Sequence, residues 1–230
     1  MRVAVDLDRE EIRAQSRSGM SSPHRMTRPQ ISINLAISAD GKISSVARRP
    51  SGWTSREDHA RLLALRAGAD ALLVGRGTLE ADRMTLKAAG DPWRCVVSRS
   101  GAFDAGHPLF HSPGGPVHLL VTEGVGQEVV GAVMHRGNLA EFLGMLADEG
   151  IRRVHCEGGG QLVFALAEMD AIDELHLTWA GHRLFGGGEA PTLSGVPGAF
   201  LPASLAFDLV DFDPRPAIGE CFLTYRRKTQ

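Results

Sequence analysis

A short apolar segment followed by a glycine-rich turn constrains this chain more than any other feature. Residues 71–74, Ala-Leu-Leu-Val, are all apolar, and Gly75, Arg76, Gly77 and Thr78 follow directly. Because the apolar run is short and has no polar side, it is typical of a strand that is buried on both faces of a sheet. Such strands occur in parallel sheets covered by helices, so the segment predicts an α/β fold.

The turn after this strand is suited to a ligand. Glycine lets the backbone bend sharply and approach another group closely. Ligands of open α/β sheets bind beyond the carboxyl ends of the strands, which is where this turn is expected. Arg76 and Thr78 could donate hydrogen bonds to phosphate oxygens there. A plain strand-to-helix connection with a solvated arginine is the alternative.

The order of the expected elements indicates a mostly parallel sheet. The expected strands before the C-terminus are 31–37, 71–74, 94–97, 117–121, 151–156 and 174–179. Helical patterns separate several of them, whereas 207–212 and 221–225 follow one another as a hairpin. We therefore predict a single α/β domain over residues 29–230, with a mostly parallel central sheet, a C-terminal antiparallel hairpin and helices on both faces. Residues 1–28 are polar and rich in Arg and Ser, and we expect them to form a disordered tail.

Two helices carry clear signals at their ends. Ser55 is the expected N-cap of the first helix, which we expect to end at Gly68 in the left-handed conformation. Three leucines are assigned to its buried face: Leu62, Leu63 and Leu65. The second helix begins at the capping-box pair Asn138 and Glu141 and ends at Gly150.

A run of three glycines marks a second turn of the ligand-binding kind. The expected strand 151–156 runs into Glu157, then into the glycines 158–160, and an apolar helix begins at Leu162. A strand, a glycine run and a helix in this order direct bare backbone N–H groups and a helix N-terminus at a phosphate. Glu157 is then expected to face a substrate rather than the phosphates, or to be a solvated acid. A flexible turn is the alternative for the whole segment.

Two further turns carry basic side chains. Ser98, Arg99 and Ser100 follow the expected strand 94–97, at a position where a dinucleotide enzyme could hold an adenosine 2′-phosphate. Lys42 follows an Asp-Gly bend and could meet an anion. Each turn could equally be a solvated loop.

Composition excludes several classes of protein. A formal net charge of -2 over 230 residues argues against a dedicated nucleic-acid binder. No apolar run approaches the ~18 residues of a membrane span, and the N-terminal segment lacks the apolar core of a signal peptide. Pro108 between His107 and His111 argues against a metal-binding helix face, so we assign no metal. Three widely spaced cysteines favour buried free thiols in a reducing cytoplasm: Cys95, Cys156 and Cys221.

Together these motifs resemble a known family, the reductase domain of riboflavin biosynthesis, which is the C-terminal half of the bacterial bifunctional deaminase-reductase. The resemblance extends over residues 29–230 and rests on 36–42, 51–55, 65–67, 70–75, 77–78, 81–82 and 157–159. The family shares the dihydrofolate-reductase fold, whose own Gly-Arg-x-Thr and Gly-Gly-Gly turns match 75–78 and 158–160. The sequence contains no His-x-Glu followed by Pro-Cys-x-x-Cys, the deaminase signature.

The resemblance implies an enzyme that uses NADPH to reduce a phosphoribosylamino-pyrimidine to its ribitylamino form. It implies a substrate site formed by five residues: Lys42, Ser51, Arg66, Leu86 and Glu157. It implies a cofactor site at Ala36, Trp53, Thr78, Asp82, Gly159, Gly160, Gln161 and Leu162. The turns described above add Gly75, Arg76, Ser98, Arg99 and Gly158 to the cofactor site. Lys42 and Arg66 could neutralise the substrate phosphate, and no residue is identified as the proton donor.

The loop after Thr78 departs from the family pattern. The usual Asp-Asp-Pro-x-Leu is replaced by Asp82-Arg83-Met84-Thr85-Leu86. The substrate is therefore left open between the deaminated pyrimidine, the diamino pyrimidine and another molecule. The alternatives are a dihydrofolate reductase, for which Asp58 is the obvious carboxylate on the first helix, another NADPH-dependent reductase of the same fold, and a non-catalytic nucleotide-binding module.

The C-terminal hairpin predicts a homodimer. Residues 207–225 place alternating apolar residues at one end of the expected sheet. An exposed sheet edge of this kind invites pairing or needs covering, and the family resemblance points the same way. The expected partners are thus a small phosphorylated pyrimidine and a second copy of the chain, with no nucleic acid and no membrane.

Overall fold

A computed structural model of the chain describes residues 28–45, 47, 52–195 and 201–228. The tail expected over residues 1–28 lies outside the described residues except for Arg28, whose guanidinium is 2.6 Å from an oxygen of Asp173. The expected substrate residue Ser51 also lies outside them.

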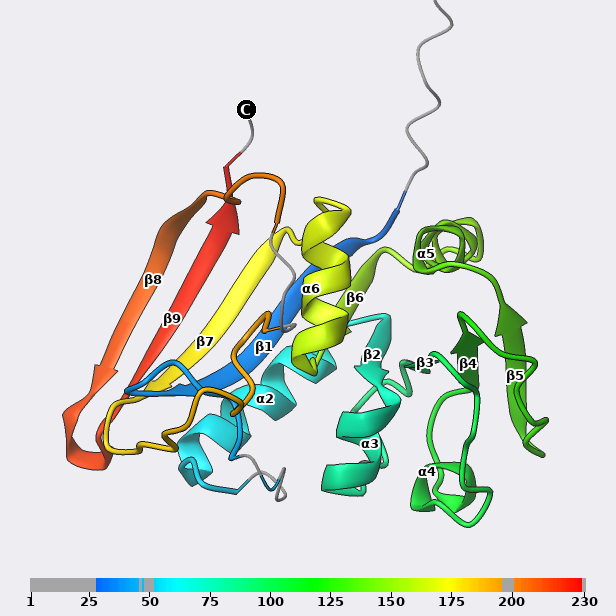
Figure 1. The fold of residues 1–230 in the computed structure, drawn as a ribbon, viewed down its shortest axis with the longest axis horizontal. Coiled ribbons are helices and arrows are strands. Elements are labelled where there is room, and N and C mark those ends of the chain that lie inside the picture. The colour runs from blue at the N-terminus through cyan, green and yellow to red at the C-terminus, as the bar shows by residue number, and fades with distance from the viewer. Residues whose placement is uncertain (1–27, 46, 48–51, 196–200, 229–230) are drawn as a thin grey trace, which may run out of the picture.

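Nine strands form one sheet in this described part of the chain, in the order β5-β4-β3-β2-β6-β1-β7-β9-β8 (Figure 1). Their bounds are β1 Gln30–Ser38, β2 Ala71–Gly75, β3 Trp93–Ser98, β4 Val117–Val121, β5 Ala132–Arg136, β6 Arg153–Cys156, β7 Glu174–Ala180, β8 Phe207–Arg215 and β9 Glu220–Arg227. All neighbours from β5 to β7 are parallel, whereas β9 pairs antiparallel with both β7 and β8. The predicted mostly parallel sheet with a C-terminal antiparallel hairpin is confirmed.

Helices cover both faces of the sheet, as predicted (Figure 1). They are α2 Arg56–Ala67, α3 Arg76–Asp82, α4 Pro108–His111, α5 Leu139–Asp148 and α6 Gly160–Glu168, with the short 3-10 helix η1 at Pro216–Ile218. Strand β2 shows why two layers are needed. Ala71 and Leu73 belong to a core formed with α5 and α6, whereas Leu72 and Val74 belong to a second core with α3 and α4. The strand is therefore buried on both faces.

Two expectations for the first helix are wrong. Gly68 ends α2 at φ -87° and ψ -3°, because its N–H continues a right-handed turn to the Leu65 carbonyl. None of the twelve residues of α2, all of them described, is buried, and Leu63 is 44% exposed. The leucines do not form a buried face because α2 meets the sheet through polar side chains, among them Asp58 and Arg61.

The other helix signals hold, and one strand was missed. Ser55 caps α2, and Asn138 and Glu141 form both hydrogen bonds of a capping box at α5. Strand β5 lacks a long apolar run and was not predicted; it forms by backbone pairing with β4 at the sheet edge. The three cysteines are free and buried, as expected.

Candidate functional site

The two glycine turns singled out in the sequence lie side by side at the carboxyl ends of β2 and β6. These strands are neighbours in the sheet, and β1 lies on the other side of β6. Gly75 N–H donates to the Gly158 carbonyl at 3.1 Å, and Glu157 N–H donates to the Leu73 carbonyl at 2.9 Å. The parallel pairing of β2 with β6 therefore brings together turns that are about eighty residues apart in the sequence.

The second turn has no room for side chains. Gly158 and Gly159 have φ angles of 85° and 71°, which L-residues rarely adopt. A Cβ on Gly158 would lie 2.7 Å from Leu35 Cδ2, and one on Gly159 would lie 2.8 Å from Thr78 Oγ1. Backbone N–H groups are therefore the groups that this turn presents.

Helix α6 begins at this turn. Its N-cap is Gly159, and no described side chain accepts a hydrogen bond from its first turn. The side chain of Leu162 is buried beneath the turn, whereas that of Gln161 is exposed. Free N–H groups at a helix N-terminus, together with the helix dipole, favour an anion. The turn can thus hold a phosphate without a basic side chain.

A buried ion pair borders this turn. Arg66, near the end of α2, contacts Glu157 twice, through Nε–Oε1 and Nη2–Oε2, both at 2.6 Å. The Arg66 side chain also donates to the Lys87 carbonyl, which lies in the loop after α3. The structure therefore pairs two residues that the sequence had assigned separately to the substrate.

The loop after α3 is held in an unusual conformation. Leu86 is 1% exposed and has φ 52°, a rare backbone angle for a bulky side chain. The next residue, Lys87, accepts a hydrogen bond from Arg66 through its backbone carbonyl. The strained conformation of Leu86 therefore holds the loop against the ion pair. Asp82, near the start of the same loop, also has a partner in the structure.

Polar side chains also line the opposite half of α2. Thr178 on β7 donates to Asp58 Oδ1 at 2.5 Å, and the Ser55 hydroxyl donates to Glu220 at 2.6 Å. Arg61 donates to the Leu223 carbonyl at 2.9 Å and stacks over the Phe222 ring. Helix α2 is thus attached to β7 and β9 by hydrogen bonds rather than by an apolar seam.

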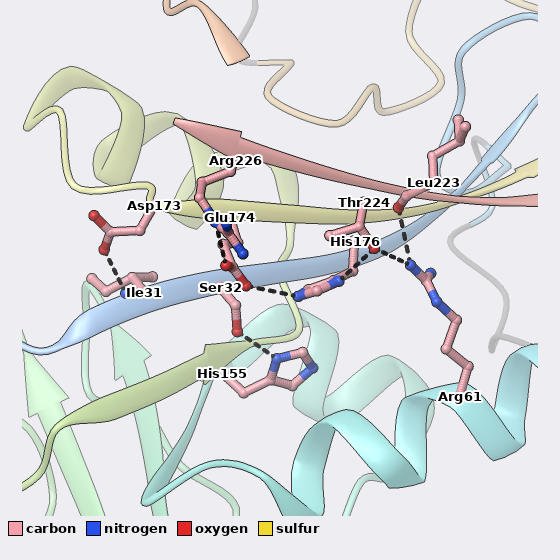
Figure 2. A network of polar contacts seen from close by, with 10 residues as sticks. All are labelled: Ile31, Ser32, Arg61, His155, Asp173, Glu174, His176, Leu223, Thr224 and Arg226. Atoms are coloured by element: carbon pink, nitrogen blue, oxygen red, sulfur yellow. Dashed lines mark hydrogen bonds and ion pairs between the residues drawn. The ribbon is translucent and has the colours of Figure 1, made fainter. Parts of the chain in front are cut away.

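The sheet face beneath α2 carries a network of histidines (Figure 2). His155 Nδ1 is 2.9 Å from Ser32 Oγ, and His176 lies between Thr224 at 3.2 Å and Glu174 at 3.5 Å. Figure 2 shows Arg61 extending from α2 toward β9 next to His176. Burial, and secondarily His176, Arg66 and Arg61, lower the pKa of His155 to about 3, so this imidazole is neutral at physiological pH.

Three other expected site residues lie around the end of β1. The Lys42 backbone N–H donates to Ser38 Oγ, and its side chain is partly exposed. Trp53 packs edge-on against Phe185, with ring centroids 5.0 Å apart. Ala36 lies within β1, opposite Thr178 of β7 and on the face that α2 covers.

The two arginines expected at a 2′-phosphate differ in their surroundings. Arg76 is bound to Glu80 at 2.9 Å and to the Ala102 carbonyl at 3.0 Å. Arg99 is exposed, and its side chain makes no hydrogen bond or ion pair with a residue that the structure describes. The Ser98 hydroxyl is buried and accepts from the Gly101 N–H, so it shapes the turn.

Sequence reasoning missed several polar residues of this region: Ser32, Asn34, Arg61, His155, His176 and Thr178. Their signal in the sequence was a polar residue at every second position of strands that should be covered by a helix.

Within the described residues, no group of three or more His, Cys, Asp or Glu side chains could hold a metal ion. No described helix has the length and apolar character of a membrane span.

Residues 29–208 match the RibD C-terminal domain family. The 2,5-diamino-6-ribosylamino-4(3H)-pyrimidinone 5′-phosphate reductase of Archaeoglobus fulgidus is 30% identical over 190 residues, which cover 72% of this chain and 86% of the relative. Both matches thus extend over most of this chain, and the resemblance inferred from the motifs is confirmed.

Two solved structures confirm the fold. A diaminohydroxyphosphoribosylaminopyrimidine deaminase/5-amino-6-(5-phosphoribosylamino)uracil reductase of Thermotoga maritima superposes with a TM-score of 0.74 at 20% identity, over 87% of this chain. This chain spans 57% of that protein's length. A dihydrofolate reductase of Enterococcus faecalis superposes with a TM-score of 0.55 at 15% identity, covering 87% of this chain and 97% of that one.

Proposed function

The chain belongs to the RibD C-terminal domain family, and we propose that it uses NADPH to reduce a 5-phosphoribosylamino-pyrimidine to its ribitylamino form in riboflavin biosynthesis. It is a reductase by this membership, and the family's reductases use a nicotinamide cofactor. The relative from Archaeoglobus fulgidus is named for a diamino substrate, so we propose the diamino pyrimidine phosphate as the substrate of this chain.

One observation carries the proposal: the uncapped glycine turn at α6 lies directly beside the Arg66–Glu157 pair and the polar face beneath α2. The turn suits the pyrophosphate of a dinucleotide, because no side chain caps the start of α6 and a side chain on the turn itself would clash. The polar face suits a heterocycle with amino and carbonyl groups. Cofactor and substrate would then meet over β1 at Ala36, whose small side chain leaves space for both.

The residues of this chain would act by binding and alignment. NADPH supplies the hydride when it is bound, and transfer requires its nicotinamide to be held close to the imine carbon of the opened ribose. Glu157, fixed by Arg66, would orient the substrate, while Lys42 would meet its phosphate. Arg66 contributes less to the phosphate than expected from the sequence, because Glu157 already balances its charge.

We also propose that NADPH is preferred to NADH and that the enzyme is a cytoplasmic homodimer. Exposed Arg99, without a described partner, is the best placed of the two arginines for a 2′-phosphate.

The edge strand β8 exposes three apolar side chains, Leu209 at 51%, Val210 at 46% and Phe212 at 61%. A second copy covering them would remove both apolar surface and an open sheet edge from water. Buried free cysteines fit a reducing compartment.

A dihydrofolate reductase is the second candidate, and it is suggested by the position of Asp58, which contacts Thr178. This carboxylate on α2 faces the sheet, and within the described residues its Oδ2 carries no hydrogen bond. Such an oxygen could accept from the amino group of a pteridine or from the 2-amino group of the diamino pyrimidine. The contact therefore supports both candidates.

The decisive experiment follows NADPH oxidation with three substrates side by side: the diamino pyrimidine phosphate, its deaminated counterpart and dihydrofolate. We expect the diamino compound to have the highest kcat/KM. Turnover of dihydrofolate alone would replace the proposed function with the second candidate. Tight NADPH binding without turnover of any of the three would instead indicate a non-catalytic nucleotide-binding module.

A further inference from the structure

Three buried side-chain atoms have no hydrogen-bond partner among the described residues: Asn34 Oδ1, His107 Nε2 and His155 Nε2. His107 caps α4 through its other ring nitrogen. The other two residues lie on neighbouring strands, β1 and β6, on the face beneath α2. Ser32 is the register partner of His155, and Asn34 lies two residues further along β1 on the same face.

The polar groups around Asn34 are already occupied. His176, its register partner on β7, is bound by Thr224 and Glu174. His155 Nδ1 is bound by Ser32. Among the imidazole nitrogens of His155 and His176, only His155 Nε2 is left open within the described residues. The Asn34 amide likewise forms no hydrogen bond with a described residue.

The two residues differ in exposure. Asn34 is partly exposed although its oxygen is buried, and none of the described residues of α2 above it is buried. His155, by contrast, is 1% exposed, so its open nitrogen is shielded from water. A buried polar atom without a partner lowers stability unless a water, an ion or a ligand completes it.

We propose that the Asn34 amide binds the lactam edge of the substrate's pyrimidinone ring and that His155 Nε2 binds a polar substituent next to that edge. This inference rests on the proposed function. A lactam has an N–H beside a C=O, so the ring N–H would donate to Asn34 Oδ1 and the ring carbonyl would accept from Asn34 Nδ2. His155 can fill either role, because the Ser32 hydroxyl can donate to its other nitrogen or accept from it.

The position of Asn34 fits such a role. Ala36 follows two residues later on the same face, at the place where we propose that the cofactor meets the substrate. Glu157 follows His155 by two residues, directly after the end of β6, and borders the same face. The diamino and deaminated pyrimidines share the lactam edge, so Asn34 sets the affinity for both and does not discriminate between them.

The test is Asn34→Leu, which replaces the amide with an apolar side chain of similar size. We expect the melting temperature of the ligand-free protein to hold or rise, because an unsatisfied buried oxygen is removed. We expect KM to rise at least tenfold for both pyrimidines, with NADPH affinity unchanged. Asn34→Ser should raise KM in the same way and serves if the leucine variant does not fold. His155→Leu should raise KM with unchanged NADPH affinity.

The matched control is His118→Leu, which removes a buried histidine under α5, far from this face. His118 is hydrogen-bonded to His135 at 2.9 Å, so its loss should lower the melting temperature and leave KM unchanged. An unchanged KM in Asn34→Leu and Asn34→Ser, with the wild type active, would overturn the inference and leave the proposed function standing. If the wild type binds the pyrimidines without reducing them, the proposed function fails, and the same variants are judged by their dissociation constants. Absence of binding by the wild type would overturn both.

Discussion

Arg66 and Glu157 form a two-point ion pair that joins the end of α2 to the end of β6. The side chains are 11% and 4% exposed, so the pair is shielded from water. Glu157 can therefore stand next to a phosphate-binding turn, because Arg66 balances its charge. The pair also fixes the distance between α2 and the glycine turn, which are the two walls of the proposed site.

Glu157→Gln is expected to affect both stability and substrate use. The glutamine leaves the Arg66 guanidinium without a counter-charge, and breaking a buried pair costs roughly 3 kcal/mol. Denaturant unfolding should report this loss. Initial rates should show a raised substrate KM, while NADPH affinity, measured by fluorescence, stays within a few-fold of the wild type.

The double variant Arg66→Leu/Glu157→Leu is the control. Removing both charges together should recover much of the lost stability, since no uncompensated charge is left buried, but substrate use should remain poor. Sharply reduced NADPH affinity with an unchanged substrate KM in Glu157→Gln would assign Glu157 to the cofactor instead.

Gly159→Ala should weaken NADPH binding at least tenfold. Alanine at φ 71° is strained, and its Cβ would lie 2.8 Å from Thr78 Oγ1, which disturbs the turn that presents the N–H groups. The matched control is Gly150→Ala, where φ is 88° but a Cβ would meet nothing within 4 Å. Both variants should lose roughly 1–2 kcal/mol of stability to the left-handed backbone, and Gly159→Ala should lose more because of the Cβ contact. Equal NADPH affinities of the Gly159→Ala and Gly150→Ala variants would show that the turn does not bind the cofactor.

Arg99→Ala should raise KM for NADPH roughly tenfold or more and leave KM for NADH nearly unchanged. A charge-assisted hydrogen bond contributes about 1.5–3 kcal/mol, and only NADPH carries the 2′-phosphate. Steady-state rates with both cofactors provide the measurement. Should both cofactors respond equally, Arg76→Ala would be the next variant, although Glu80 and Ala102 already occupy that side chain.

Stability should fall as the pH decreases from about 6.5 toward 4. Burial, and secondarily His135, lower the pKa of His118 from 6.5 to about 4, and the pKa of His155 is lowered to about 3. The folded protein therefore keeps both rings neutral, while the unfolded chain takes up protons below pH 6.5. Each of the two histidines should thus lower the free energy of unfolding by up to about 1.4 kcal/mol for every pH unit of decrease. Denaturant unfolding at several pH values should show a shallower slope for His118→Phe.

The homodimer is tested by light scattering at micromolar concentration. We expect a dimer mass for the wild type and a monomer mass for Phe212→Asp, which places a charge on the exposed edge strand β8. Because Phe212 is 61% exposed, the substitution should leave the fold intact. A monomer mass for the wild type would contradict the proposal, since a stable interface should bury about 1,000 Å² or more.

Local sequence signals were enough for most of the secondary structure. The run at 71–74 was typical of a doubly buried strand, and the Asn138 and Glu141 side chains had capping partners within one turn of helix. These signals succeeded because their causes lie within a few residues. The buried face assigned to the first helix failed for the opposite reason. Its leucines looked like a core stripe, but the sheet beneath them is polar, and that depends on strands far along the chain.

The sequence by itself determined the α/β class, the two glycine turns and the family, because apolar periodicity and glycine placement are written locally. Only the tertiary structure decided which polar groups are satisfied. It paired Arg66 with Glu157 across 91 positions and Asp58 with Thr178 across 120. It also left the Asn34 amide and His155 Nε2 open beneath α2. Hydrogen-bond partners are set by strand order and helix placement, so no local pattern could reveal which of these side chains remain available to a ligand.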